Sequence, residues 1–323
     1  MRVAVVMGGP SPEAEVSRAS ARAVARGLEE SGHTPTLVEL TPAAAVSLGA
    51  GFDVVFPLVH GVLGEDGCLQ GLLELLGVPY VGSGVLASAL AMDKVAAKRA
   101  FRDVGLPVAK ELVATRETPP DAIFAALGSG VVVKPRAAGS AAGVSRIQGG
   151  DIGALVAALT RALCFGGSAL CEELVVGREL TCGVTDLAAL TSPPGVSALA
   201  VTEIVPRRGD FYDFASKYGA GGSDHVCPAE LDGDVTRAVQ AAAVLAHRTL
   251  GCRDLSRSDF LLRADGSFVI LETNTLPGMT ATSLYPEAMA ARGVPFASMC
   301  DALVRAAAGR GAADHGPVLE LPT

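Results

Sequence analysis

Hydrophobic and polar positions along residues 1–92 alternate in blocks that predict strands and helices in turn. Residues 2–7 form a short apolar run rich in β-branched side chains, which is typical of a buried parallel strand. Later blocks predict a helix at about 16–30, strands at 36–40 and 53–59, and a helix at 68–76. Strands that alternate with helices in this way predict a parallel sheet with helices on both faces.

Beyond residue 92 the hydrophobic pattern predicts a mixture of helices and shorter strands. The expected helices are 88–104, 152–162, 231–250 and 296–308, and the expected strands are 130–135, 169–175 and 201–205. Residues 309–323 are predicted to be a weakly ordered tail.

A β-hairpin is the clearest pattern in the sequence, because two apolar runs flank the turn-forming pair Asp265-Gly266. A two-residue turn at this pair places Asp259 opposite Glu272 and Arg257 opposite Asn274 on the neighbouring strand. Because side chains alternate along a strand, all four project from one face of the hairpin.

Two carboxylates and an amide oxygen lie close together on that face, since directly opposed Cβ atoms are about 4.5–5.5 Å apart. These oxygen atoms repel one another unless a cation lies between them. Hard oxygen ligands suit Mg²⁺, which takes its remaining ligands from water and substrate phosphates. The hairpin therefore predicts a magnesium site, and a solvated face with scattered charges is the alternative.

Phosphate binding is the second activity that the pattern indicates. Lys134 lies inside an apolar strand, and the small-residue loop at 136–145 would let backbone N–H groups approach an anion. A buried lysine needs a counter-charge, which a phosphate would supply; a flexible hairpin loop is the alternative. Residues 209–219 are rich in glycine and aromatic side chains, which is typical of a lid over a substrate or of a surface Ω-loop.

Composition narrows the classes of function. The chain has 323 residues, enough for two or three domains, and half of them are hydrophobic. The net charge of −8 and the lack of a basic stripe argue against nucleic acid as a partner. No apolar run approaches the roughly 20 residues of a membrane span. The seven cysteines show no paired spacing, so we expect reduced thiols, no zinc site and a cytoplasmic protein.

Taken together, these pieces resemble the D-alanine–D-alanine ligases of the ATP-grasp superfamily, from residue 1 to about 308. Five separated motifs carry the resemblance: residues 8–17; residues 60–71; Val133-Lys134-Pro135 with Gly139-Ser140; Phe211-Tyr212-Asp213 with Lys217-Tyr218; and Arg257-Ser258-Asp259 with residues 272–280. The resemblance implies an α/β fold with α+β character in the ATP-grasp part. The implied domains are a Rossmann-like substrate domain at 1–92, a central ATP-grasp subdomain at 93–183, and a C-terminal catalytic domain at 184–323 with a lid loop at 207–226.

The resemblance also implies which residues bind ATP and metal. Two Mg²⁺ ions, for which Mn²⁺ is an alternative, would be held by Asp259, Glu272 and Asn274. The residues matching ATP contacts are Lys94 and Lys134 at the phosphates, Glu172 and Glu173 at adenine and ribose, and Glu179.

Matching positions exist for the groups that bind and join the two substrates. Glu15 would receive the ammonium group of the first D-alanine, and His60 is a further substrate-binding residue. The Gly278 N–H and Arg257 match groups that stabilise the tetrahedral intermediate. The remaining matches are Ser140, Glu179 and Tyr218, which would close the lid, and Lys217, Ser283 and the Leu284 N–H, which would lie near the second substrate or the phosphate.

The reaction implied by the resemblance has two steps and serves peptidoglycan synthesis. ATP phosphorylates the carboxylate of one D-alanine, and the amine of a second D-alanine attacks the acyl phosphate and releases phosphate. No general base is assigned. The resemblance also implies a homodimer.

Three departures from the family pattern leave alternatives open. Ala141-Ala142 follow Ser140 where a second serine is usual, and Phe214 stands where a tyrosine is common. Ser258 and Thr273 replace apolar residues, and strand alternation points both away from the expected metal site. The alternatives are a divergent ligase that tolerates inhibitors or joins other D-amino acids, and a non-catalytic ATP-binding relative.

Overall fold

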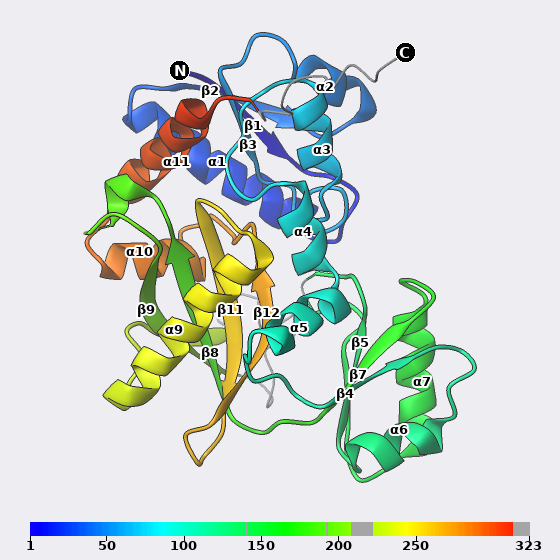
Figure 1. Ribbon diagram of the computed structural model, residues 1–323. Helices are drawn as coiled ribbons and strands as arrows, with labels where there is room; N and C mark the ends of the chain where they lie inside the picture. Colours follow the sequence, from blue (N-terminus) through cyan, green and yellow to red (C-terminus); the bar gives the residue numbers. More distant parts are fainter. Residues whose placement is uncertain (140, 192, 208–221, 313–323) are drawn as a thin grey trace, which may run out of the picture.

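The structure of the chain, a computed structural model, describes residues 1–139, 141–191, 193–207 and 222–312. Its named strands form three sheets, with the orders β2-β1-β3, β4-β7-β5-β6 and β10-β9-β8-β11-β12 (Figure 1). Pairing in the first sheet is parallel and pairing in the other two is antiparallel. This confirms the predicted fold class. Among the described residues, no helix combines the length and apolarity that crossing a membrane requires.

Residues 3–6 of the first sheet are buried on both of its faces, as the continuous apolar run predicts. Its elements are β1 (Arg2–Met7), β2 (Thr34–Glu39) and β3 (Val54–Pro57), with α1 (Ala14–Glu30), α2 (Pro42–Ser47) and α3 (Cys68–Leu75). Val3 and Val5 pack in one core cluster and Ala4 and Val6 in another. Alternation along β1 therefore divides its side chains between two helical layers.

The last helix, α11 (Phe296–Arg310), completes the N-terminal part of the molecule. It packs beside α1 and β3, and in Figure 1 the red helix lies against the blue one. Met299 and Leu303 share a core cluster with Val3 and Val5. The chain thus returns to its starting layer, which no local pattern predicts.

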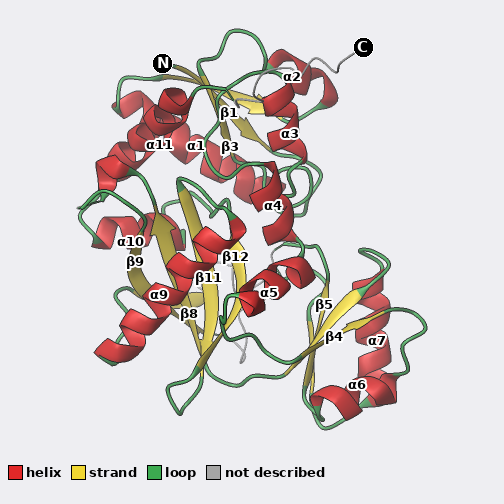
Figure 2. Ribbon diagram, viewed as in Figure 1, coloured by secondary structure: helices red, strands yellow, loops and turns green. Residues whose placement is uncertain are grey.

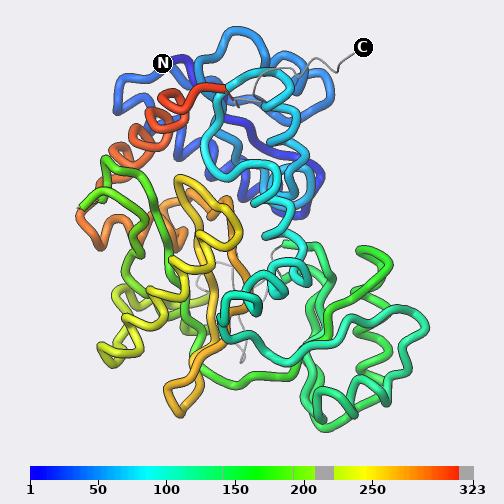
Figure 3. Tube along the Cα trace, viewed as in Figure 1, coloured from blue at the N-terminus to red at the C-terminus, as the bar shows by residue number. Residues whose placement is uncertain are grey.

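A capping residue divides the single helix predicted at 88–104. The structure has α4 (Val85–Met92) and α5 (Lys94–Asp103), separated at Asp93. The Asp93 carboxylate accepts hydrogen bonds from the backbone of Val95 and Ala96, each at 3.1 Å, so it starts a new helix instead of continuing the old one. Figure 3 shows this segment descending from the N-terminal part to the other two sheets.

The second sheet has a helical face and an open face. It consists of β4 (Glu111–Ala114), β5 (Val131–Pro135), β6 (Ser145–Ile147) and β7 (Ala169–Glu173), with α6 (Pro120–Leu127) and α7 (Ile152–Leu163) on one side (Figure 2). Val131, Val133 and Cys171 pack under these helices. Since side chains alternate, Lys134 and Glu172 point to the opposite face. Neither β4 nor α6 was predicted, because each is short and has no clear period.

The third sheet carries the predicted hairpin. Its strands are β8 (Arg178–Thr185), β9 (Ser197–Pro206), β10 (Ser223–Val226), β11 (Leu255–Leu262) and β12 (Phe268–Asn274), and its helices are α9 (Gly233–Leu250), α10 (Leu284–Ala291) and the short η1 (Ala188–Leu190). The boundary predicted between residues 183 and 184 is corrected, since it falls inside β8. Because β8 pairs with β11 along its length, all of β8 belongs to the third sheet.

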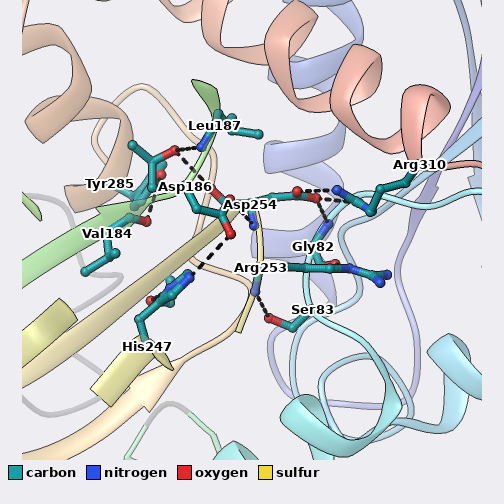
Figure 4. Close-up of polar contacts among 12 residues, drawn as sticks. Gly82, Ser83, Val184, Asp186, Leu187, His247, Arg253, Asp254, Tyr285 and Arg310 are labelled. Carbon is teal, nitrogen blue, oxygen red and sulfur yellow. Dashed lines mark hydrogen bonds and ion pairs between the residues drawn. The ribbon is translucent and has the colours of Figure 1, made fainter. Parts of the chain in front are cut away.

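A buried carboxylate joins the N-terminal part to the start of the hairpin (Figure 4). Asp254, which directly precedes β11, accepts a hydrogen bond from the Gly82 N–H at 2.7 Å. Its two oxygens pair with the Arg310 guanidinium at 2.6 and 2.8 Å, and Arg310 also donates to the Tyr80 carbonyl at 3.1 Å. The Asp254 N–H donates to Asp186 at 2.8 Å. Chain segments around Gly82, Asp254 and Arg310, which are distant in the sequence, therefore meet at the Asp254 carboxylate.

Replacing Arg310 by alanine should lower the free energy of unfolding by about 3 kcal/mol, because the buried Asp254 carboxylate loses its cation. Arg305→Ala is the matched control, since Arg305 lies on the same helix and its side chain is 65% exposed in its pair with Asp301. That variant should lose less than about 1 kcal/mol. Urea unfolding of both variants measures the difference, and equal losses would contradict the role given to Asp254.

Candidate active site

The predicted facing of hairpin residues is confirmed, although the predicted turn is wrong. Arg257 pairs with Asn274 and Asp259 pairs with Glu272. The turn has three residues instead of two, because the Arg263 N–H bonds to the Ser267 carbonyl at 2.7 Å.

A β-bulge corrects the resulting shift in register. The pairing slips between Asp259 and Phe260, so that Phe260 faces Ile270 and Leu271 has no directly opposed residue. The longer turn and the bulge each move the register by one residue in opposite senses. The carboxylates therefore meet as the sequence predicts, for a reason that the sequence pattern did not contain.

Each predicted metal-binding carboxylate lies against a cation. Asp259 accepts two hydrogen bonds from Arg257, at 2.9 and 2.8 Å, and one from the Thr181 hydroxyl at 2.6 Å. The Asn274 amide donates to Asp259 Oδ2 at 3.2 Å. Glu272 Oε2 lies 3.1 Å from the Lys94 Nζ. The three predicted ligands thus converge beside two positive charges.

This donor set fits a hard divalent cation. Within the described residues no cluster of three or more His, Cys, Asp or Glu side chains could hold a metal. Two carboxylates and an amide oxygen, which a half-turn of the Asn274 amide would present, suit a metal that completes its shell with water and phosphate oxygens. Asp259, Glu272 and Asn274 are the residues that could hold it.

The two unusual polar residues of the hairpin bond to each other on its other face. Ser258 and Thr273 are buried, and their hydroxyl oxygens lie 2.8 Å apart. Ser256, two residues earlier on the same face, bonds to His247 of α9 at 2.8 Å. The departures from the family pattern at Ser258 and Thr273 therefore satisfy one another under α9, away from the predicted metal ligands.

Ser258→Ala or Thr273→Val alone should reduce the free energy of unfolding by about 1–3 kcal/mol, because each leaves one buried hydroxyl without its partner. The double variant should lose less than the sum of the two, with a coupling of about 1 kcal/mol. Denaturant unfolding of the four proteins measures the cycle. Strictly additive losses would show that the hydroxyls do not act as a pair.

A cavity of about 550 Å³ opens between the second and third sheets. The structure brings together on its walls these residues predicted to bind ATP or metal: Lys94, Lys134, Glu172, Glu173, Glu179, Asp259 and Glu272. Val132 of β5 and the hairpin residues Leu261 and Leu271 supply apolar walls. A cavity with both apolar and charged walls matches a ligand that has a flat base and an anionic tail.

Lys134 and Glu172 form an ion pair on the open face of the second sheet. Burial by itself raises the pKa of Glu172, but Lys134 and then Lys98 outweigh it and hold that pKa at about 2. Burial lowers the pKa of Lys134, and Glu172 outweighs this effect and raises it. Both groups are therefore charged at neutral pH.

The loop predicted to bind phosphate is held by the start of α5. The Lys94 Nζ donates to the Ala138 carbonyl at 2.8 Å, and the Lys94 N–H donates to the Arg136 carbonyl at 3.0 Å. The Arg136 guanidinium pairs with Asp93, the cap of α5. Ala141 and Ala142 line the cavity, and Ala141 has a left-handed backbone with φ 56°.

The assignment of Glu15 as the substrate carboxylate is corrected by the structure. Its side chain is 82% exposed on the first turn of α1 and pairs with Arg18. Glu13 is buried instead, just before the helix. A Cβ added to Gly139 of the phosphate loop would lie 2.7 Å from Glu13 Oε2, and one added to Gly61 would lie 3.4 Å away. The carboxylate between the two loops is therefore that of Glu13.

His60 and Glu65 surround Glu13 with further buried groups. His60 is 4% exposed, and its carbonyl accepts a hydrogen bond from the Ser11 hydroxyl at 2.7 Å. Burial lowers the pKa of His60. Burial, followed by the charge of Glu13, raises the pKa of Glu65 to about 8, while Glu65 accepts a hydrogen bond from the Gly61 N–H at 2.6 Å. At neutral pH the group therefore favours a neutral His60 and a protonated Glu65.

Residues predicted near the second substrate lie where the chain leaves the hairpin. Ser283 precedes α10, and its hydroxyl accepts a hydrogen bond from the Thr280 N–H at 3.0 Å. A Cβ on Gly278 would lie 2.9 Å from the Ser283 Oγ, so a larger residue there would have to displace this hydroxyl. Leu284 is the first residue of α10, where backbone N–H groups lack partners within the helix.

The remaining predicted site residues, Ser140, Lys217 and Tyr218, lie outside the described residues. Two buried groups near the site were not predicted. Glu13 occurs two positions before Glu15 in the same motif, so only the exact start of α1 separates them. Lys98 follows Lys94 by one helical turn, a spacing that places both on one side of α5 and could have indicated it.

Family profiles and individual relatives identify the same protein family for this chain. Residues 101–305 match the family profile described as "D-ala D-ala ligase C-terminus", and residues 39–83 match "D-ala D-ala ligase N-terminus". A protein of Gluconobacter oxydans named D-alanine--D-alanine ligase is 45% identical over 316 residues, covering 96% of this chain and 100% of that protein. A protein of the same name from Geobacter sulfurreducens is 41% identical over 305 residues, covering 94% of this chain and 93% of that protein.

Solved structures agree with these relatives. The D-alanine-D-alanine ligase of Coxiella burnetii superposes with a TM-score of 0.81 and 25% sequence identity, covering 96% of this chain and 94% of that one. The corresponding ligase of Bacillus anthracis gives 0.80 and 27%, covering 96% of this chain and 100% of that one. With relatives this similar along nearly the whole length, the chain belongs to the D-alanine–D-alanine ligase family.

Proposed function

We propose that this protein uses ATP to join two D-alanine molecules into D-alanyl-D-alanine for peptidoglycan synthesis. The observation that carries the proposal is the convergence of Lys94, Lys134, Asp259 and Glu272 on one cavity. Alternating cations and carboxylates there match a polyphosphate that arrives with a divalent cation. Family membership supports D-alanine as the substrate.

In the first step the carboxylate of one D-alanine attacks the terminal phosphate of ATP, which gives an acyl phosphate and releases ADP. Lys94 and Lys134 would neutralise the charge of the phosphates, and Val132, Leu261 and Leu271 would enclose the base. Glu13 would hold the ammonium of this D-alanine, because its carboxylate is buried beside the phosphate loop. Glu172 and Glu173 are the proposed contacts to base and ribose, and Glu179 is a further proposed ATP contact, as the resemblance implies.

In the second step the amine of another D-alanine attacks the acyl phosphate, and inorganic phosphate leaves. Arg257 and the Gly278 N–H would stabilise the charge that develops on the carbonyl oxygen. Ser283 and the Leu284 N–H would orient the second carboxylate or the phosphate. The roles of Ser140, Glu179 and Tyr218 in closing the site remain predictions from the resemblance. The place of Lys217 near the second carboxylate or the phosphate is likewise a prediction.

Asp259, Glu272 and Asn274 would hold the divalent cations, for which we propose two Mg²⁺ ions with Mn²⁺ as an alternative. When bound, such cations neutralise charge on the transferred phosphoryl group. Arg257 and Lys94 would balance the charges of the two carboxylates until the cations arrive with ATP. From the resemblance we also propose a cytoplasmic location and a homodimer.

Phosphate release from Mg·ATP tests the function, measured with D-alanine and in parallel with D-serine, D-lactate, L-alanine and no amino acid. Release with D-alanine, accompanied by dipeptide, is the expected result. Faster turnover with another D-amino acid would favour the divergent ligase, which the hydroxyl-free Ala141-Ala142 wall would permit. ATP binding without turnover on any substrate would favour the non-catalytic relative.

A further inference from the structure

Lys98 is a fully buried lysine that the proposed reaction does not use. Its side chain is 1% exposed, and it is absent from the walls of the nucleotide cavity, whereas Lys134 lines that cavity and is 12% exposed. Lys98 extends from α5 toward the open face of the second sheet, where it forms an ion pair with Glu172. A ligand in the cavity can therefore reach Lys134 but not Lys98.

Glu111 and Glu172 explain why a cation belongs at this position. The two residues are directly opposed on β4 and β7, so their side chains share one face of the sheet. Like charges placed opposite each other repel and destabilise the pairing. The Lys98 Nζ contacts Glu172 and lies 3.9 Å from Glu111 Oε2. Burial lowers the pKa of Lys98, and both carboxylates oppose this effect by favouring the charged form of the lysine.

Glu111 and Glu172 differ in the cations that pair with them. Glu111 already has a partner, since the Arg102 Nη2 lies 2.6 Å from its Oε1. Glu172 has two partners, with Lys98 at one oxygen and Lys134 at the other. If Lys98 were absent, Glu172 would have Lys134 as its one lysine partner among the described residues.

We propose that Lys98 is a positioning residue, the buried counter-charge that lets Lys134 leave Glu172 for the phosphates of the nucleotide. Lys134 must exchange a carboxylate for a phosphate when ATP binds, because it is the cavity-facing lysine of the pair. That exchange leaves a buried carboxylate behind, and an unpaired buried charge is costly. Lys98 removes this cost by keeping Glu172 paired from behind the cavity wall. This inference rests on the proposed function, since it takes ATP as the ligand.

The inference predicts a loss that depends on phosphate. Lys98→Met keeps the length of the side chain and removes its charge, so it should weaken binding of Mg·ATP at least about tenfold. Adenosine has no phosphate and does not require Lys134, so its affinity should change less than about threefold. Lys98→Arg keeps the charge and should stay near the wild type. Calorimetric titration of each protein with the two ligands measures the difference.

The same Lys98 substitution in a Glu172→Gln protein tests whether Lys98 acts through the Glu172 carboxylate. In Glu172→Gln the carboxylate that pairs with Lys134 is gone, so adding Lys98→Met should change the affinity for Mg·ATP less than about threefold. This double variant removes one charge of each sign, so it remains informative even if Lys98→Met alone does not fold.

Three results would overturn the inference: unchanged Mg·ATP binding by Lys98→Met, an equal loss for adenosine, or a loss of about tenfold that persists with Glu172→Gln. The proposed function fails in a different way. A wild-type protein that binds no Mg·ATP would overturn the ATP ligase assignment and this inference with it, whereas normal wild-type binding confines any failure to Lys98.

Discussion

Glu272→Ala should lower the rate of D-alanyl-D-alanine formation by about 10³-fold or more, because a divalent cation at a phosphoryl group contributes several kcal/mol of transition-state stabilisation. Glu272 faces Asp259 across the hairpin and lies 3.1 Å from Lys94. Its removal takes away one of the proposed metal ligands and the partner of a phosphate-binding lysine. The fold should persist, because the carboxylate points into the cavity instead of the core.

Asp265→Ala is the matched control for this variant. Asp265 lies on the same hairpin, at the exposed turn, and its carboxylate bonds to Ser267 at 2.9 Å. Removing it should leave turnover within about twofold, since an exposed turn residue touches none of the proposed ligands. Dipeptide formation at increasing Mg²⁺ and the melting temperature should be measured for both variants. Near-normal turnover by Glu272→Ala would end the metal assignment.

Glu13→Gln should raise the KM for D-alanine by about 100-fold, because the loss of one partner in a buried charge pair costs about 3 kcal/mol. The substitution keeps the size of the side chain and removes its charge. The affinity for Mg·ATP should change little, since Glu13 does not line the nucleotide cavity. Steady-state kinetics with varied D-alanine, together with nucleotide titration, separates the two effects.

Glu15→Gln distinguishes the two carboxylates of one motif. Its side chain is 82% exposed and pairs with Arg18, so its KM for D-alanine should stay within about twofold of the wild type. The opposite outcome, with Glu15→Gln impaired and Glu13→Gln normal, would restore the assignment made from sequence.

The hairpin shows how a sequence pattern can be correct while part of its reasoning is not. Alternation and a two-residue turn predicted that Asp259 lies opposite Glu272, and the structure has this pairing. The turn length was wrong, and the bulge at Leu271 compensated for it. A bulge depends on how β12 bends within its sheet, so the local pattern does not reveal it.

Elements defined by local chemistry were the ones that the sequence predicted well. The apolar run of β1, the period of α9 and the lysine-containing strand β5 each have a signal within a few residues. The break between α4 and α5 was missed although Asp93 is a good capping residue, because a helical period on both sides outweighed it. The short elements β4 and α6 had no period to detect.

The sequence by itself thus determined the fold class, the hairpin carboxylates and the pairing of Lys134 with a small-residue loop. Tertiary structure decided which acid of the Glu13–Glu15 pair is buried, because the exact start of α1 turns one inward and the other to solvent. It also decided the place of Lys98, which becomes a buried cation beside the opposed carboxylates of β4 and β7. The roles of Glu13 and Lys98 depend on burial and on contacts between distant segments. The periodic pattern of a sequence contains information on neither.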